Sequence, residues 1–222
     1  MAIVDYGFGN LRSVARACEH VGMQSRITSD PEAVERADGV ILPGIGAFGD
    51  AMDALRRLGL VDVLRHVASE RPLMGVCLGA QLLQQESAEF GCHEGLGILD
   101  GAVAELPRRT PSGARIKVPH VGWTAIDPVR SWNDTMLAGV HPGDSLYFTH
   151  SFYLVPADPS IVLSTSVYGD VSFCSSYQRA NVFGCQSHPE RSGASGLQIY
   201  RNLKRACRHD CPADVSEVID AN

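Results

Sequence analysis

The chain has 222 residues, of which 45% are hydrophobic and 20% charged, and its formal net charge is −6. This balance is typical of a soluble globular protein, and the acidic charge argues against a nucleic-acid partner. The sequence contains no 18-residue apolar run and no basic leader before an apolar stretch, so we expect no membrane span and no signal peptide. Seven cysteines at irregular spacings indicate reduced thiols in the cytoplasm.

The first part of the chain predicts strands that alternate with helices. Short apolar runs predict strands at 2–4, 23–28, 39–42 and 73–76. Helical spacing and start signals predict helices at 11–21, from 29 onwards, at 50–58, at 61–69 and at 81–86. Such alternation is typical of a mostly parallel central sheet that helices cover on both faces.

After about residue 95 the segments become shorter and richer in Val, Thr, Ser, Tyr and Phe. They predict a mixed or antiparallel second half, with strands at 101–106, 114–118, 145–152, 161–168, 172–177 and 181–186. A last helix at 196–207 precedes a polar tail. The sequence shows no linker and no internal repeat, so we expect one α/β domain over residues 1–222.

The segment 74–83 connects a predicted strand to a predicted helix through Gly75-x-Cys77-x-Gly79. This is the thiol form of a nucleophile elbow, in which the nucleophile lies at the apex of a very tight turn. Glycines on both sides avoid collisions with the neighbouring backbone. The positive end of the following helix favours thiolate over thiol, so Cys77 is the predicted nucleophile.

The run Gly44-Ile45-Gly46-Ala47-Phe48-Gly49 fits G-x-G-x-x-G and has three interpretations. It could hold a dinucleotide, with Asp62 as a ribose-binding acid, but the preceding proline and the place on the third strand count against this. It could be only a tight strand-to-helix turn. We favour a glycine loop that offers backbone N–H groups to an oxyanion, with Leu78 supplying the second donor.

A cysteine nucleophile needs a base, and His188 fits this role best among the eight histidines. It follows a predicted strand, and Pro189 fixes the backbone between it and Glu190, which can orient the ring. His20 and His66 are expected on helix surfaces and His209 in the tail. The groups Cys92-His93-Glu94 and Cys207-x-His209-x-Cys211 lack paired ligand spacing, so we predict no metal and no other cofactor.

Two further segments, 118–123 and 147–153, are dense in aromatic and histidine side chains. They are either core strands with aromatic residues at the edge, or a substrate edge or partner surface. The residues themselves leave this choice open.

The motifs together resemble a known family. Gly-Val-Cys-Leu-Gly at 75–79 with His-Pro-Glu at 188–190 resembles the class I (triad) glutamine amidotransferases, whose flavodoxin-like fold matches the expected α/β architecture. The runs at 5–11, 42–52, 119–123, 147–151 and 186–193 resemble more closely the glutaminase subunits of imidazole glycerol phosphate synthase. The resemblance extends from Ile3 to about Leu203. Ser187 and Thr124 depart from it, because this family usually has a bulky aromatic residue and an asparagine there.

The resemblance implies a role for each matching position. Cys77 is the implied nucleophile, His188 the general acid and base, and Glu190 its orienting partner. The implied oxyanion hole is formed by Gly44, Ile45, Gly46 and Leu78, with a loop peptide that must reorient before the subunit is active. The implied glutamine contacts are Gln81, Ser151 and Phe152, and the implied partner contacts are Asn10, His120, Trp123 and Arg191.

The implied partner is a (β/α)₈-barrel cyclase subunit, in a heterodimer. Ammonia from glutamine passes through that barrel to its acceptor, and the products are imidazole glycerol phosphate and AICAR, a step of histidine biosynthesis. Three alternatives remain: a glutaminase subunit that feeds another acceptor, such as a sugar amidotransferase; a free-standing γ-glutamyl hydrolase; and a non-catalytic scaffold subunit.

Overall fold

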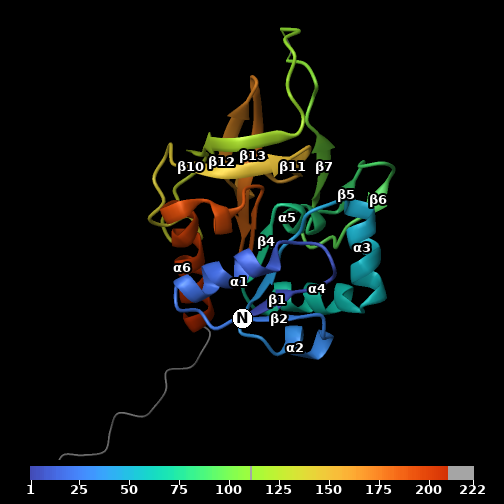
Figure 1. Cartoon of the computed structure of the whole chain (residues 1–222), viewed down its shortest axis with the longest axis vertical. Coiled ribbons are helices and arrows are strands. Elements are labelled where there is room, and N and C mark those ends of the chain that lie inside the picture. The colour runs from blue at the N-terminus through green and yellow to red at the C-terminus, as the bar shows by residue number, and fades with distance from the viewer. Residues whose placement is uncertain (111, 210–222) are drawn as a thin grey trace, which may run out of the picture.

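The computed structural model describes residues 1–110 and 112–209. The predicted polar tail begins later than expected, because the last helix continues to His209; the rest of the tail, with Cys211, lies outside the described residues. The first part of the chain alternates short strands and helices, as Figure 1 shows: β1 (Ala2–Val4), α1 (Leu11–His20), β2 (Arg26–Thr28), α2 (Pro31–Glu35), β3 (Val40–Leu42), α3 (Phe48–Arg57), α4 (Leu60–Glu70), β4 (Leu73–Val76) and α5 (Leu78–Leu82).

The second part is dominated by strands, which gather in the upper part of Figure 1. Its elements are β5 (Glu86–Ser87), β6 (His93–Glu94), β7 (Gly101–Glu105), β8 (His120–Ala125), β9 (Asp127–Pro128), β10 (Ser145–His150), β11 (Phe152–Pro156), η1 (Pro159–Ile161), β12 (Val162–Tyr168), β13 (Val171–Arg179), β14 (Val182–Cys185), η2 (Pro189–Arg191) and α6 (Gly193–His209).

One large sheet runs through the described part of the chain in the order β2-β1-β3-β4-β14-β13-β11-β7-β5-β6, and β12 joins β13 to β9. The strands from β2 to β14 pair in parallel, and β14, β13, β11 and β7 pair antiparallel. A separate antiparallel pair, β8 and β10, lies beside this sheet. The predicted α/β architecture with a mixed second half is therefore confirmed.

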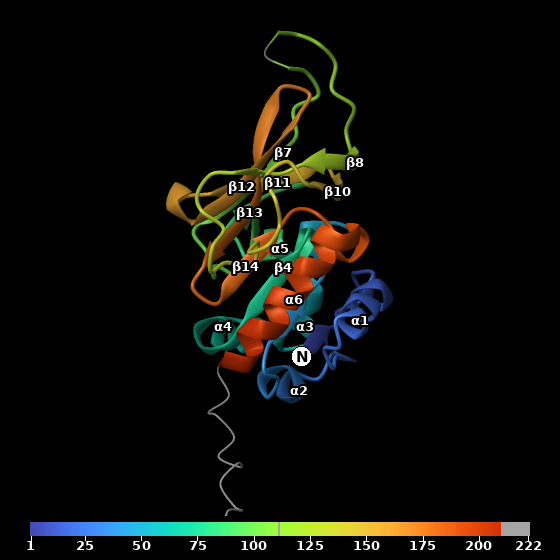
Figure 2. The ribbon, with the colours of Figure 1, turned by 90° about the vertical axis from the view of Figure 1, so that its left-hand side faces the viewer.

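Helices cover both faces of the parallel strands, because successive side chains of a strand point to opposite faces. Ala2 and Val4 of β1 pack with α2, α3 and α4 in one buried cluster, whereas Ile3 packs with α1 and α6 in the other. In Figure 2, α1 and α6 lie on the side that faces the viewer. The carboxyl ends of β4 and β14 thus open between two filled hydrophobic layers, and the side chains that follow these strands come together there.

Several predicted boundaries were wrong. The helix expected at 81–86 is α5, which ends at Leu82, because the carbonyls of Leu82, Gln84 and Gln85 accept N–H groups from the segment 95–97. The strand expected at 145–152 is two strands, β10 and β11, which belong to different sheets and are separated at Ser151.

The segment 114–118 was predicted as a strand but forms only an isolated bridge between Arg115 and Arg109. The neighbouring segment 120–125, with His120 and Trp123, is the strand β8 that pairs with β10. The helix predicted from Asp50 begins earlier, at Phe48, and the helix predicted from Gly196 begins at Gly193. Within the described residues, no helix combines the length and apolar character that crossing a membrane requires.

Candidate active site

Cys77 lies between β4 and α5 in a strained backbone conformation, with φ 52° and ψ −111°. A Cβ atom on Gly79 would collide with the carbonyl oxygen of Leu42, and one on Gly75 would lie 2.7 Å from Cα of Ala80. The turn therefore requires glycine on both sides of Cys77. This backbone has the geometry predicted for a nucleophile elbow.

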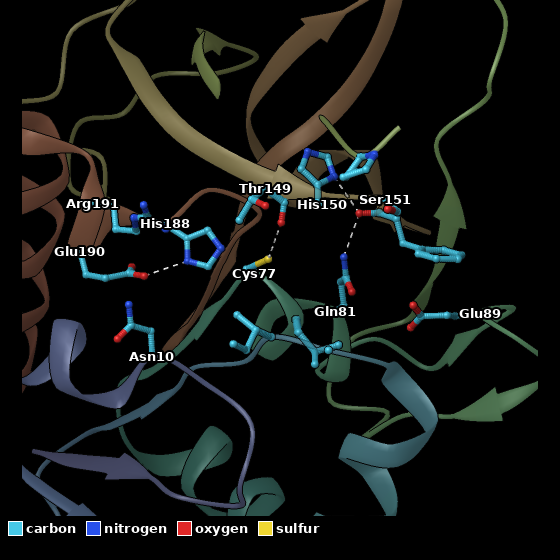
Figure 3. Close-up of a pocket in the computed structure, with 15 residues that line it drawn as sticks. Asn10, Cys77, Gln81, Glu89, Thr149, His150, Ser151, His188, Glu190 and Arg191 are labelled. Atoms are coloured by element: carbon cyan, nitrogen blue, oxygen red, sulfur yellow. Dashed lines mark hydrogen bonds and ion pairs between the residues drawn. The ribbon is translucent and has the colours of Figure 1, made fainter. Parts of the chain in front are cut away.

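His188 and Glu190 are held beside this turn by the chain that leaves β14. The N–H of Cys77 donates to the carbonyl of Cys185 at 2.8 Å, and the N–H of His188 donates to the carbonyl of Tyr147 at 2.8 Å. Nδ1 of His188 lies 2.8 Å from Oε1 of Glu190. Figure 3 shows the imidazole between Glu190 and Cys77. The structure thus brings together the three residues that the sequence singled out.

The environment of His188 favours the imidazolium. Burial of the ring disfavours the charged form, but the charge and hydrogen bond of Cys77 and those of Glu190 outweigh it and raise the pKa of His188 to about 10. A protonated ring at neutral pH is one half of a thiolate–imidazolium pair. The arrangement can therefore supply both a nucleophile and a proton donor.

A pocket of about 440 Å³ opens above the sulfur. Most residues predicted for the site line it, as Figure 3 shows for the labelled ones: Asn10, Ile45, Gly46, Cys77, Leu78, Gln81, Ser151, Phe152, His188, Glu190 and Arg191. Gly44, His120 and Trp123 do not line it. The volume suits a small polar metabolite of amino-acid size.

The glycine loop approaches the elbow from β3. Ile45 and Gly46 line the pocket, and Gly46 has φ 112°. Gly44 packs below them, where a Cβ atom would lie 2.9 Å from the backbone nitrogen of Gly79. Leu78 is the first residue of α5, so its N–H has no acceptor within the helix. The loop and the helix start can therefore both direct N–H groups at an oxyanion.

The dinucleotide interpretation of this loop finds no support. Asp62 lies on α4 with its side chain 95% exposed, and it pairs with Arg65 at 3.4 Å. It does not line the pocket. Among the described residues, no group of three or more His, Cys, Asp or Glu side chains is arranged to hold a metal ion.

Gln81 joins three parts of the pocket wall. Its Nε2 donates to the carbonyl of Phe152 at 2.9 Å and to Oε1 of Gln186 at 3.1 Å. Nε2 of Gln186 in turn lies 3.6 Å from the sulfur of Cys77. Thr149 contributes its carbonyl oxygen, 3.8 Å from the same sulfur. Gln186 and Thr149 were not singled out as site residues, although both belong to motifs that the sequence displays.

Glu89 is a pocket residue that the sequence reasoning missed. Its carboxylate points into the pocket (Figure 3) and accepts the N–H of Phe48 at 2.6 Å. Burial raises the pKa of this carboxyl, and the Phe48 hydrogen bond opposes the shift. Glu89 follows β5 in a loop without any motif, so no local signal in the sequence points to it. A buried carboxylate here offers an acceptor for a cationic group.

Arg191 lines the pocket, and Tyr147 lies between it and Trp123 outside the pocket. The guanidinium of Arg191 lies 4.4 Å from the centroid of the Tyr147 ring, and the Trp123 ring meets the same ring edge-on at 6.0 Å. Trp123 is 58% exposed. Asn10 is exposed and also lines the pocket. An exposed aromatic–arginine cluster of this kind is typical of a protein-binding surface.

His120 was predicted to face a partner, and its burial contradicts this. Its ring is 1% exposed and stacks on Phe148 and Tyr168, with centroids 5.2 and 4.0 Å away. The reason lies in the alternation of strand β8, which turns Val121 and Trp123 outward and His120 inward. Of the interpretations left open for this segment, the core-strand one holds for His120.

Comparison with known proteins places this geometry in a family. The model of the family described as glutamine amidotransferase class-I matches residues 2–205. The chain is 48% identical over 205 residues to imidazole glycerol phosphate synthase subunit HisH of Syntrophotalea carbinolica. The matched region covers 91% of this chain and 98% of that protein. It is 44% identical to the HisH subunit of Moorella thermoacetica, over 94% of this chain and 96% of that protein.

Solved structures share the fold at low sequence identity. The structure of PurLQS from Thermotoga maritima matches with a TM-score of 0.70 and 22% identity, over 92% of this chain and 96% of that chain. A crystal structure of a glutamine amidotransferase matches with the same TM-score and 18% identity, over 93% of this chain and 98% of that chain.

Proposed function

This chain belongs to the class-I glutamine amidotransferase family, and we propose that it hydrolyses glutamine as the glutaminase subunit of an imidazole glycerol phosphate synthase. The observation that supports this most directly is the pocket in which Cys77, His188 and Glu190 meet. Relatives that share 44% and 48% identity over nearly their whole length carry the name of that subunit. The ammonia then serves histidine biosynthesis.

The chemistry begins at the sulfur. The Cys77 thiolate attacks the side-chain amide carbon of glutamine, and the amide oxygen becomes an oxyanion. The N–H of Leu78 and an N–H of the Gly44–Gly46 loop hold this oxyanion. The His188 imidazolium gives its Nε2 proton to the departing nitrogen, and ammonia leaves as the tetrahedral intermediate collapses to a glutamyl thioester. His188 then takes a proton from water, which hydrolyses the thioester to glutamate and restores the thiolate.

The remaining pocket residues orient the substrate. The buried Glu89 carboxylate accepts hydrogen bonds from the α-ammonium group of glutamine. Gln81 and the backbone at Ser151 and Phe152 contact the rest of the glutamine molecule. Glu190 keeps the His188 ring in the tautomer and orientation that both proton transfers need.

The partner in this proposal is a (β/α)₈-barrel cyclase, bound in a heterodimer over the pocket rim. Trp123, Arg191 and Asn10 supply the contact surface on this chain. Ammonia released at Cys77 passes into the barrel and reacts with the acceptor there. No cofactor takes part in the glutaminase half-reaction.

The test is a glutaminase assay of the chain alone and with the cyclase subunit of the same organism, with and without an acceptor analogue. We expect slow hydrolysis by the chain alone and a large stimulation by the loaded cyclase. A hydrolysis rate that is independent of the cyclase would overturn the assignment and favour a free-standing γ-glutamyl hydrolase. Cyclase activity with added ammonium salt checks that the partner is competent.

A further inference from the structure

Two buried histidines face each other across the β8–β10 pair, outside the set of residues that the mechanism uses. His120 and His150 are register partners, and their rings are 1% and 6% exposed. Nδ1 of His120 lies 3.0 Å from Nε2 of His150. Each ring has one further partner: Nε2 of His120 lies 2.8 Å from Oγ1 of Thr124, and Nδ1 of His150 lies 2.8 Å from the carbonyl oxygen of Phe152.

These contacts determine where each proton lies. Burial lowers the pKa of His120 to about 4 and that of His150 to about 3, so both rings are neutral at physiological pH. The Phe152 carbonyl can only accept, so Nδ1 of His150 donates to it and Nε2 of the same ring is an acceptor. Nδ1 of His120 must then donate to that acceptor. Nε2 of His120 is left as an acceptor, and the Thr124 hydroxyl donates to it.

The far end of this chain is part of the catalytic pocket. The Phe152 carbonyl that receives the His150 proton also accepts Nε2 of Gln81 at 2.9 Å. His150 also follows Thr149, whose carbonyl oxygen contacts the Cys77 sulfur. The near end, Thr124, is half-exposed and directly follows Trp123 on β8. The hydrogen bonds therefore connect the strand that carries the exposed tryptophan with the residues around the sulfur.

We propose that Thr124, His120 and His150 are positioning residues: a hydrogen-bond relay of fixed direction that sets the Phe152 carbonyl and, through it, Gln81. The inference rests on the proposed function, which makes this pocket the glutamine site. Through the relay, a change of Thr124 or of its strand alters how well the pocket is arranged for substrate, without touching the reacting atoms. Contact of a partner with β8 reaches the pocket by the same route.

The relay can be tested because each hydrogen bond in it has a fixed donor, beginning with the Thr124 hydroxyl. If the Thr124 hydroxyl is removed, Nε2 of His120 is left buried without a donor. A proton moved to Nε2 would find no acceptor there and would cost the bonds to His150 and Phe152, so both rings keep the proton on Nδ1. The His120 ring nevertheless loses the bond that fixes it from the side of Thr124, and the His150 ring and the Phe152 carbonyl are then held less firmly.

The experiment compares Thr124→Val with Thr124→Ser and Thr124→Asn in the complex with saturating cyclase subunit. Valine keeps the shape of threonine but cannot donate, whereas serine and asparagine both carry a donor. We expect Thr124→Val to raise KM for glutamine roughly three- to tenfold, with kcat changed by less than about twofold. Both donor variants should retain the wild-type KM.

A second readout measures the tautomers directly, through ¹⁵N chemical shifts and long-range couplings of the imidazole rings between pH 6 and 8. In the wild-type chain we expect both rings to carry the proton on Nδ1 and Nε2 of His120 to show the ¹⁵N shift of a hydrogen-bonded acceptor. In Thr124→Val we expect the protons to stay on Nδ1 and this acceptor shift to move towards that of an imidazole nitrogen without a hydrogen bond. A wild-type ring protonated on Nε2, or a Thr124→Val enzyme with unchanged KM, overturns the relay. If the wild-type complex did not hydrolyse glutamine, the proposed function would fail, whereas the tautomers would still decide whether the relay exists.

Discussion

Nδ1 of His188 lies 2.8 Å from Oε1 of Glu190, and the two side chains are only 5% and 1% exposed. A hydrogen bond between charged partners that are shielded from solvent is strong, and it fixes the ring with Nε2 directed at Cys77. Together with the charge of Cys77, this carboxylate holds the pKa of His188 at about 10 in spite of burial. The contact therefore determines both the orientation and the protonation of the proposed acid.

The first prediction concerns the charge of this carboxylate. Glu190→Gln keeps the size of the side chain but lowers the pKa of His188, and its amide can favour the wrong tautomer. We expect kcat for glutamine hydrolysis to fall by roughly 10²- to 10⁴-fold, the range found for orienting carboxylates and for general acid–base groups. The steady-state rate of ammonia release at saturating glutamine measures this kcat. A variant that retains more than a tenth of the activity would show that Glu190 does not act through His188.

The second prediction separates the two half-reactions. Cys77→Ala removes the nucleophile and should abolish glutamine-dependent synthesis in the complex, whereas synthesis driven by ammonium salt should persist, because the cyclase carries out that chemistry. Cys92→Ala is the matched control, since Cys92 is exposed and lies outside the pocket. It should leave both activities unchanged. Glutamine-driven turnover by the Cys77 variant would exclude a thioester at this residue.

The third prediction tests Glu89. Glu89→Gln retains an oxygen that can accept the N–H of Phe48 but removes the negative charge. If Glu89 binds the α-ammonium group, KM for glutamine should rise roughly 10- to 100-fold, with kcat nearly constant. The control is 4-carbamoylbutanoate, which is glutamine without its amino group. Wild type and variant should use it equally well; an equal loss with both substrates would indicate that the substitution only disturbs the loop.

The three residues Cys77, His188 and Glu190 were predictable from the sequence. They lie in short motifs whose backbone requirements are local: a glycine on each side of the elbow, and a proline between base and acid. Local patterns of this kind can be recognised without a fold. Strands β1, β3 and β4 were also predictable, because they are buried on both faces and read as continuous apolar runs.

Features that depend on pairing between distant segments could not be predicted. The contact between His120 and His150 follows from the antiparallel register of β8 and β10, which no local pattern specifies. The same register decides that His120 is buried and Trp123 exposed. Glu89 reaches the pocket only because its loop is folded against the start of α3. Tertiary hydrogen bonds with the segment 95–97 likewise ended α5 earlier than its helical pattern indicated.

The fourth prediction tests the tight packing at the elbow. In Gly79→Ala the added methyl group collides with the Leu42 carbonyl, so α5 must move away from the end of β3, and we expect a loss of more than about 3 kcal/mol in the free energy of unfolding. Gly97→Ala is the matched control: Gly97 has φ 60° but open space around it, so only the backbone cost of about 1–2 kcal/mol applies. Urea unfolding followed by circular dichroism measures both. Equal losses would contradict the proposed collision.

The last prediction concerns acid stability, to which the two neutral histidines contribute. Their pKa values in the folded chain are about 4 for His120 and about 3 for His150, against about 6.5 in an unfolded chain. Between these values the unfolded state binds more protons than the folded state. The stability that the two neutral rings contribute is therefore fully present above about pH 6.5 and is lost as the pH decreases towards 4, with each ring accounting for up to about 1.4 kcal/mol per pH unit.

Urea midpoints at pH 7, 6 and 5 measure this slope, in a window that lies above the titration of Asp144 and Asp158, whose pKa values are lowered. His120→Gln removes one of the two rings, so the variant should be less stable than wild type at pH 7 and yet lose less stability on acidification. The groups that face His150, His188 among them, are the same in both proteins. The difference between the two pH dependences of the urea midpoint therefore reports on His120. Parallel pH profiles for the two proteins would mean that the His120–His150 pair takes up protons without opposing the fold, and the neutral relay would have to be abandoned.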